Sequence, residues 1–348
     1  MVQKRFEATW ESVRTHQVPQ WYEEAGLGIF IHWGLFSVPA FAEPSAELGT
    51  IPDHEWYLRN PYAEWYYNSV NVGQGPTWEH HIKTYGPDFR YEQFADMWKA
   101  EKWDPDEWAD LFARAGARYV VLVTKHHDGF CLFPSKYTDY NSVKRGPGRD
   151  IVSELAAAVR RRGMRFGTYY SALVDWTFSH EPIYNDTDLR LGNCPTYEYA
   201  DYAYKQSLEL IDNYHPDIFW NDIGWPYAGE HMLPRFFSYY YNHCPEGVVN
   251  DRFNGLMHDF TVREYQYGEK NPACKWEMTR GLGLSFGYNA NEGPEYIMTG
   301  EQLYELYADT HAHGGNLLIN VGPMADGTIP GLQAAALEYL GKRIGCQE

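Results

Sequence analysis

In the segment DPDEWADLFARAGARYVVLVT, residues 104–124, a helical pattern is followed directly by a strand pattern. Asp104 suits a helix N-cap, Pro105 the first helical position and Gly116 the C-terminal stop. The run ARYVVLVT, residues 117–124, is almost continuously apolar, which is typical of a parallel strand covered on both faces. A helix followed at once by such a strand is the repeating unit of α/β proteins.

The same alternation of helix and strand recurs along the chain. Further helices are predicted at 150–163 (DIVSELAAAVRRRG), 197–214 (YEYADYAYKQSLELIDNY) and around 301–311. Further strands are predicted at 26–34 (GLGIFIHWG), 164–171 (MRFGTYYS), 216–222 (PDIFWND), 247–251 (GVVND) and 314–322 (GGNLLINVG).

This alternation over about 330 residues favours a (β/α)8-like, TIM-type barrel, with residues 1–348 as a single catalytic domain. A doubly wound open sheet is the structural alternative. No GxGxxG motif follows the first predicted strand, which ends instead in His32-Trp33-Gly34. The barrel is therefore the preferred fold.

Composition narrows the class of protein. Of 348 residues, 44% are hydrophobic and 22% charged, which is ordinary for a globular protein, whereas the aromatic share of 17% is high. Lys plus Arg is 29 and Asp plus Glu is 47, so the net charge is 29 − 47 = −18. Such a surface repels nucleic acids and anionic membranes. Aromatic rings beyond those that fill the core suit ligands with flat apolar faces, such as sugars.

The cysteines and the N-terminus lead us to expect a cytoplasmic protein. The first residues contain no apolar core of a secretory signal, and no run approaches the roughly 20 apolar residues of a membrane span. The cysteines are odd in number and lack CxxC pairs, which favours reduced thiols over disulfides or a zinc site. They are Cys131, Cys194, Cys244, Cys274 and Cys346.

Polar side chains follow the apolar runs at the positions where a barrel places its active site. A carboxylate such as Asp222, at the end of the run 218–220, is costly unless something uses it. Each group alone could be structural, as a hydrogen-bonded histidine or an ion-paired arginine. A barrel would bring all of them to one mouth, which favours a binding or catalytic site. They are His32, His126, His127, Tyr169, Asp222, Arg252 and, in FTVREYQ, Glu264.

These residue types favour hydrolysis by two acids. Adjacent histidines on a strand point to opposite faces, so one metal ion cannot easily take both His126 and His127. The sequence contains neither a GxSxG elbow nor a GxxxxGK[ST] phosphate loop. A pair of carboxylates among neutral donors and aromatic walls remains, which suits glycoside hydrolysis. No metal and no cofactor are expected.

Five longer motifs lie in order between about Trp21 and Pro330. They are GIFIHWGLFSVPA, GARYVVLVTKHHDGFCLF, NSVKRGPGRDIVSELAAAVRRRGMRFGTYYS, PDIFWNDIGW and GGNLLINVGPMADGTIP. Together, and in the same order, they resemble the catalytic domain of family 29 glycoside hydrolases, the α-L-fucosidases. The resemblance implies a (β/α)8-like barrel that releases α-linked L-fucose from oligosaccharides or glycoconjugates with retention of configuration.

The resemblance also implies roles for the site residues. Asp222 matches the nucleophile, and Arg252 would lie near the carboxylates. Trp220 and Phe286 would form the wall around the fucose methyl group. The residues expected to bind the sugar hydroxyls are His32, Glu64, Trp65, His126, His127 and Tyr169.

The general acid/base varies in position within this family. In the subgroup that this sequence resembles, the segment after NDR supplies it, which gives Glu264; Glu55 and Glu277 are kept as alternatives. Glu264 could instead serve only as an ion-pair partner of Arg263 or Arg252. A retaining mechanism predicts the two catalytic carboxyl groups about 5–5.5 Å apart.

Members of this family commonly carry a C-terminal β-sandwich, whereas this sequence stops at ALEYLGKRIGCQE, residues 336–348. A lone barrel would expose surface that the sandwich covers, which leaves room for a homo-oligomer. Two other functions stay open: a retaining glycosidase for a related sugar such as a galactoside, and a non-catalytic carbohydrate-binding barrel. The presence of both Asp222 and Glu264 favours an enzyme over a binding protein.

Overall fold

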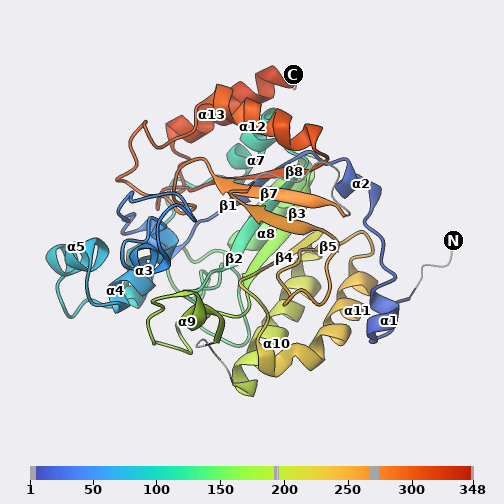
Figure 1. Cartoon of the computed structure of the whole chain (residues 1–348), viewed down its shortest axis with the longest axis horizontal. Helices are drawn as coiled ribbons and strands as arrows, with labels where there is room; N and C mark the ends of the chain where they lie inside the picture. Colours follow the sequence, from blue (N-terminus) through green and yellow to red (C-terminus); the bar gives the residue numbers. More distant parts are fainter. Residues whose placement is uncertain (1–4, 192–193, 195, 267–273, 346–348) are drawn as a thin grey trace.

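Eight parallel strands curl into a half-open barrel, and helices pack around its outer face (Figure 1). The computed structural model describes residues 5–191, 194, 196–266 and 274–345. This arrangement confirms the predicted (β/α)8-like fold. The strands are β1 (Leu27–Ile31), β2 (Tyr119–Lys125), β3 (Arg165–Ser171), β4 (Ile218–Asp222), β5 (Val248–Val249), β6 (Thr261–Glu264), β7 (Trp276–Gly281) and β8 (Asn316–Val321).

The order of the strands is β5-β4-β3-β2-β1-β8-β7-β6, so the first and last strands of the chain lie side by side. Ile29 pairs with Val120 of β2 on one side and with Ile319 of β8 on the other. Within the described residues, the two ends of the sheet, β5 and β6, meet only through an isolated parallel bridge between Asn250 and Phe260. The two edges of the half-open barrel therefore touch at this seam without forming a ladder.

Most of the helices lie in the connections between strands, and α7 and α8 start at the predicted caps. Asp104 accepts a hydrogen bond from the backbone of Asp106, and Asp150 accepts one from that of Ser153. The helices are α1 (Trp10–Val13), α2 (Gln20–Glu23), α3 (Asp53–Leu58), α4 (Tyr66–Asn71), α5 (Pro76–Tyr85), α6 (Phe94–Met97), α7 (Pro105–Arg114), α8 (Ile151–Arg161), α9 (Asp186–Leu191), α10 (Tyr197–Tyr214), α11 (Leu233–His243), α12 (Gly300–Ala312) and α13 (Gly331–Arg343), with 3₁₀ turns η1 (Leu35–Ser37), η2 (Ala63–Trp65), η3 (Tyr91–Gln93) and η4 (Tyr227–Met232).

Two hydrophobic cores follow from the alternation of side chains along each strand. On β2, Val120 and Leu122 pack in the outer core between the sheet and the helices. Val121 and Val123 face the barrel interior, where they belong to a separate inner core. The inner core also contains Phe30, Tyr169 and Trp220, so aromatic rings form the floor beneath the carboxyl ends of the strands.

Strands β6 and β7 have no counterpart in the sequence prediction. On β7, Trp276 and Met278 pack in the outer core, whereas Glu277 and Thr279 are buried polar residues. This alternation breaks the continuous apolar run that marks a parallel strand. β6 is short and only half-buried, so its apolar signal is weak.

Three of the described cysteines, Cys131, Cys194 and Cys244, are buried free thiols, and Cys274 is an exposed one. Cys346 lies outside the described residues. No helix within the described ranges combines the length and hydrophobicity needed to cross a membrane.

Candidate active site

A cavity of about 790 Å³ lies at the carboxyl ends of the strands, and every residue predicted for the site lines it. Most of these side chains belong to the last residues of a strand or to the loop directly after it, and the turn η2 supplies the other two. Residues far apart in sequence therefore meet around one space. They are His32, Glu64, Trp65, His126, His127, Tyr169, Trp220, Asp222, Arg252, Glu264 and Phe286.

The carboxylate of Asp222, at the end of β4, is buried and surrounded by donors. Oδ2 accepts a hydrogen bond of 2.6 Å from the Tyr169 hydroxyl, and Oδ1 accepts one of 2.8 Å from the backbone N–H of Ile223. Oδ1 is also paired with Nη1 of Arg252. Burial alone would raise the pKa of Asp222, but the Arg252 charge and these hydrogen bonds hold it below its usual value. Asp222 is therefore an anion at neutral pH.

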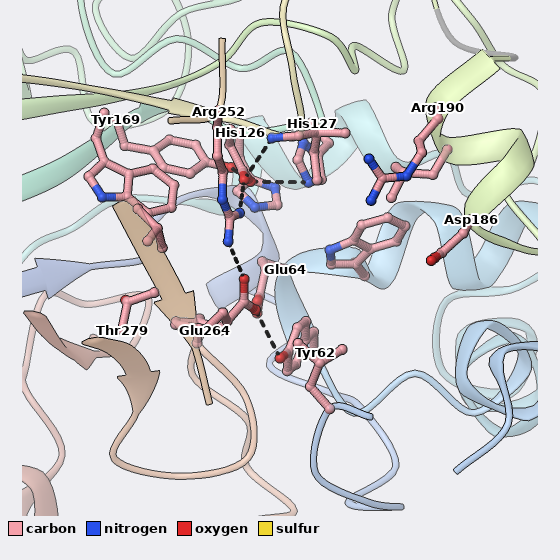
Figure 2. A pocket seen from close by; sticks show the side chains of 18 of the residues that line it. Tyr62, Glu64, His126, His127, Tyr169, Asp186, Arg190, Arg252, Glu264 and Thr279 are labelled. Carbon is pink, nitrogen blue, oxygen red and sulfur yellow. Dashed lines mark hydrogen bonds and ion pairs between the residues drawn. The ribbon is translucent and has the colours of Figure 1, made fainter. Parts of the chain in front are cut away.

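The guanidinium of Arg252 joins the two predicted catalytic acids, and Figure 2 shows its contact with Glu264. Its Nη1 binds Asp222, and its Nη2 binds Oε2 of Glu264 at 2.6 Å. The Tyr62 hydroxyl donates to the other oxygen of Glu264 at 3.3 Å. Because a guanidinium is planar and rigid, both carboxylates are held on the same side of the cavity. Burial would lower the pKa of Arg252, but the two carboxylates raise it above its usual value.

The alternatives for the acid/base do not line this cavity. Glu277 lies inside the barrel, where Trp220 donates to Oε1 at 2.9 Å and Tyr119 donates to Oε2 at 2.6 Å. Tyr22 donates to Oε2 as well, at 2.9 Å. Glu55 is an exposed residue of α3. Glu264 therefore remains the candidate, and its ion pair with Arg252 is part of the site.

The hydrogen bonds of His32 and His127 identify which ring nitrogen carries the proton. The Asn320 amide N–H donates to Phe286 O, so the amide oxygen faces Nδ1 of His32 at 2.7 Å and accepts a hydrogen bond from the Nδ1–H group. Ser171 donates its hydroxyl proton to Val174 O, so Oγ accepts from Nδ1 of His127 at 2.6 Å. Each neutral imidazole thus has an acceptor at Nε2.

Burial keeps these imidazoles neutral. It lowers the pKa of His32 to about 4 and that of His127 to about 3, although the nearby Asp222 opposes both shifts. Burial, together with repulsion from its neighbours, also lowers the pKa of His126 well below its usual value. Neutral acceptors suit the hydroxyl groups of an uncharged sugar.

His126 and His127 lie on the same side of the strand end, because the alternation of a strand does not extend past its last residue. Strand β2 ends at Lys125, so neither histidine is held in the strand. Both rings line the cavity, with their centroids 4.0 Å apart. Among the residues that the structure describes, no group of three or more His, Cys, Asp or Glu side chains is arranged to hold a metal ion.

Glu64 and Trp65 belong to the turn η2, which lies between β1 and β2 in the chain. Oε2 of Glu64 accepts a hydrogen bond of 2.7 Å from the backbone N–H of Gly287 and one of 3.2 Å from the Ser285 hydroxyl. Burial raises the pKa of Glu64 to about 7 despite these donors. The Trp65 ring lies edge-on to His127 at 5.1 Å. Both residues therefore stand at the cavity on a rigid support.

Aromatic rings form the apolar wall. Phe30, from the middle of β1, lies 5.0 Å from the Trp220 ring and 6.5 Å from the Phe286 ring. Trp220 stacks on Tyr169 at 5.6 Å, and its N–H points away to Glu277. These rings offer a surface without unpaired polar atoms, as a methyl group prefers.

Sequence reasoning missed several residues of the cavity. Phe30 and Tyr62 stand two positions before His32 and Glu64, and an alternation argument could have found Phe30. Most of the others belong to loops and short helices, which carry no strand-end signal, whereas Val262 and Thr279 lie on the unpredicted strands β6 and β7 and Asp251 ends the strand predicted at 247–251 without having been chosen. They are Leu48, Gly49, Ile51, Asp53, Trp56, Tyr57, Asp186, Leu189, Arg190, Ile223, Tyr227, Glu230, Asp251, Asn254, Gly255, Val262 and Thr279.

Comparison with known proteins gives one consistent result. A family model described as alpha-L-fucosidase matches residues 1–346. The plasma alpha-L-fucosidase of Homo sapiens is 34% identical over 356 residues, with 97% of this chain and 70% of that protein covered. Among solved structures, an alpha-L-fucosynthase of Thermotoga maritima superposes with a TM-score of 0.94 at 57% identity, covering 97% of this chain and 76% of that one. The alpha-fucosidase of the same organism in complex with fucose gives a TM-score of 0.91 at 56% identity, with the same coverage.

Proposed function

The chain belongs to the α-L-fucosidase family and hydrolyses α-L-fucosyl linkages, and from this premise we propose a retaining exo-glycosidase with Asp222 as nucleophile and Glu264 as general acid/base. The non-catalytic barrel considered from the sequence is set aside by the family. The substrate is the terminal fucose of an oligosaccharide or glycoconjugate. The observation that carries the assignment of roles is the single guanidinium shared by Asp222 and Glu264.

In the first step, Asp222 attacks the anomeric carbon while Glu264 gives its proton to the departing oxygen. Asp222 suits the attack because its lowered pKa keeps it ionised. Its hydrogen bonds also fix the direction of the carboxylate, so little reorganisation is needed. The product of this step is a fucosyl ester of Asp222.

In the second step, Glu264 acts as the base that activates water. Once Asp222 is an ester it carries no charge, and Glu264 is then the remaining carboxyl partner of the Arg252 guanidinium. This contact holds Glu264 in place beside the ester for the attack of water. Water attacks the anomeric carbon, the ester breaks, and L-fucose leaves with its original configuration.

The neutral histidines and the aromatic wall support fucose as the bound sugar. His32 and His127 present acceptors to hydroxyl groups, while Phe30, Trp220 and Phe286 favour a methyl group at C5. A galactoside would place a hydroxymethyl group on the ring instead. Comparing rates on nitrophenyl α-L-fucoside, β-D-galactoside and β-D-fucoside tests this preference. We expect the α-L-fucoside to be cleaved at least tenfold faster, and a faster galactoside would contradict the assignment.

Replacing the nucleophile tests the assignment of Asp222. Asp222→Gly should lower turnover by several orders of magnitude, and azide should restore it with formation of β-fucosyl azide. Asp251→Gly is the matched control, because Asp251 lines the same cavity but binds the backbone N–H of Val262. Azide should not rescue that variant. Near-normal activity of Asp222→Gly would remove Asp222 from the role of nucleophile.

A further inference from the structure

The cavity extends beyond the groups that surround Asp222. Its volume of about 790 Å³ lies within the roughly 300–1,000 Å³ range of pockets that enclose drug-sized ligands, so one sugar ring does not fill it. The outer part has no role in the chemistry described above. It is lined by three segments: the stretch 48–57, helix α9, and the segment from Ile223 after β4 to the turn η4. The lining residues used below are Tyr57, Asp186, Arg190, Tyr227 and Glu230.

A hydrogen bond between two of these segments builds the wall. The hydroxyl of Tyr57 in α3 donates to Oδ1 of Asp186 in α9 at 2.8 Å, although the residues are 129 positions apart in sequence. Burial and the Asp186 carboxylate raise the pKa of Tyr57, so its hydroxyl stays a donor at all relevant pH values. The contact holds α9 beside α3, and Arg190 lies one helical turn after Asp186.

The side chain of Arg190 points from α9 toward the cavity, on the side away from Tyr169 and Glu264 (Figure 2). Within the described residues it makes no hydrogen bond and no ion pair. A guanidinium presents five N–H donors in a fixed plane. At the wall of a cavity, these donors suit the hydroxyl oxygens of a second sugar.

Tyr227, the first residue of η4, supplies a flat apolar surface to the same space. Its side chain lines the cavity and is 52% exposed, so the ring is open to a ligand. Its ring forms no aromatic pair with another described residue. A tyrosine combines an apolar face with a polar tip, which suits the C–H face of a pyranose.

The charge of the lining indicates which sugars fit. The cavity is lined by seven carboxyl groups and by only two guanidinium groups, those of Arg190 and Arg252. Arg252 is already paired with two of the carboxylates. An anionic leaving group would be repelled by this excess. The acids are Asp53, Glu64, Asp186, Asp222, Glu230, Asp251 and Glu264.

We propose that the outer cavity is a leaving-group subsite for a neutral pyranose, in which Arg190 donates to sugar hydroxyls and Tyr227 stacks on the ring. The proposal rests on the proposed function, because the sugar in this subsite is the one released when the fucosyl bond breaks. It assigns Arg190 and Tyr227 as residues that determine specificity for the leaving group.

The test compares two kinds of substrate in the full chain. The leaving group of α-L-fucosyl fluoride is a single atom that does not reach the subsite, whereas neutral disaccharides of fucose with galactose or N-acetylglucosamine fill it. Arg190→Met and Tyr227→Ala should each lower kcat/KM on the best disaccharide by about tenfold, which corresponds to about 1.4 kcal/mol. Both variants should hydrolyse the fluoride within about twofold of the wild type.

Matched controls are Arg235→Met and Tyr197→Ala, which change exposed residues that do not line the cavity. They should leave both substrates unaffected. Equal losses on fluoride and disaccharide, or no loss on the disaccharide, would overturn the subsite. If the wild-type enzyme preferred a disaccharide with a carboxylate on its leaving sugar, the proposal that the subsite binds a neutral sugar would be wrong. Failure of the wild type to cleave the fluoride would instead refute the proposed function.

Discussion

The hydroxyl of Tyr169 lies 2.6 Å from Oδ2 of Asp222 and donates a hydrogen bond to it. This bond favours the ionised carboxylate and contributes to its lowered pKa. In Tyr169→Phe the pKa of Asp222 should therefore rise. Because Asp222 must be ionised to react, the acid limb of kcat/KM should move to higher pH. A shift of about one pH unit corresponds to about 1.4 kcal/mol.

The measurement is kcat/KM on nitrophenyl α-L-fucoside across the acidic range. Tyr170→Phe is the control, because the Tyr170 hydroxyl donates to Gln206 and Tyr170 does not line the cavity. Its acid limb should stay in place. An unchanged limb in Tyr169→Phe would mean that this hydrogen bond does not tune the nucleophile.

Glu264→Ala should affect substrates according to their leaving groups. A fucosyl disaccharide needs a proton on its departing oxygen, so its kcat/KM should fall by about 10² to 10⁴. α-L-Fucosyl fluoride needs little such help, so the step that forms the ester should be nearly normal on it. A burst measurement isolates that step. A uniform loss on both substrates would assign the acid to another residue.

Asn320→Asp tests the tautomer of His32. The Asn320 oxygen accepts from Nδ1, and a carboxylate at this place would stabilise the imidazolium. The pKa of His32, about 4 in the native chain, should rise. As pH falls, His32 would then protonate earlier and lose its acceptor at Nε2, so KM should rise at a higher pH than in the wild type.

The check is KM against pH, with Asn68→Asp as the control. Asn68 is a buried amide whose partners are the backbone groups of Ile183, with no imidazole among them. It reports the general cost of a buried carboxylate. A KM profile that shifts equally in both variants would argue against a specific role of Asn320.

Glu277→Gln should change the pH dependence of stability and leave catalysis almost intact. Burial raises the pKa of Glu277 to about 7, above the value of about 4.3 in an unfolded chain. Because its pKa is raised, Glu277 contributes its full stabilisation at pH values below its pKa in the unfolded chain. This contribution is lost as pH rises through its pKa in the folded protein. The wild type should lose up to about 1.4 kcal/mol per pH unit from this group between those two values.

Glu277→Gln lacks this loss. At pH 5 it should be less stable by about 1 kcal/mol, because one amide N–H meets a hydrogen-bond donor. That difference should shrink or reverse by pH 8. Urea unfolding at both pH values measures it, with the exposed Glu55→Gln as a variant whose difference stays constant. Loss of turnover in Glu277→Gln at full stability would reopen the assignment of Glu264.

The sequence predicted the barrel because several of its strands, such as β2, read as continuous apolar runs. Strand β7 was not predicted because the buried polar residues Glu277 and Thr279, on its inner face, alternate with its apolar residues. Asp222 and Arg252 were accessible to reasoning because the carboxyl ends of parallel strands converge. Glu64, Trp65 and Phe286 lie outside the strands, and only the family resemblance pointed to them.

Other parts of the site depend on contacts that no sequence period encodes. The hydrogen bond between Tyr57 and Asp186 joins two short helices, α3 and α9, whose relative position is known only once the barrel has formed. Asn320 did leave a signal, since it is a polar residue in the apolar run NLLINVG and is almost completely buried. A buried amide in such a run needs a partner, and here the partner is His32.

Among the strands described, β5 and β6 share no ladder of paired residues, and an isolated bridge between Asn250 and Phe260 joins them instead. Arg252 follows one of these strands and Glu264 ends the other, so their ion pair connects the two strands at their carboxyl ends. The same two side chains thus hold the strand edges together and take part in catalysis. When the ion pair is removed by substitution, amide hydrogens along this joint should consequently exchange with solvent faster.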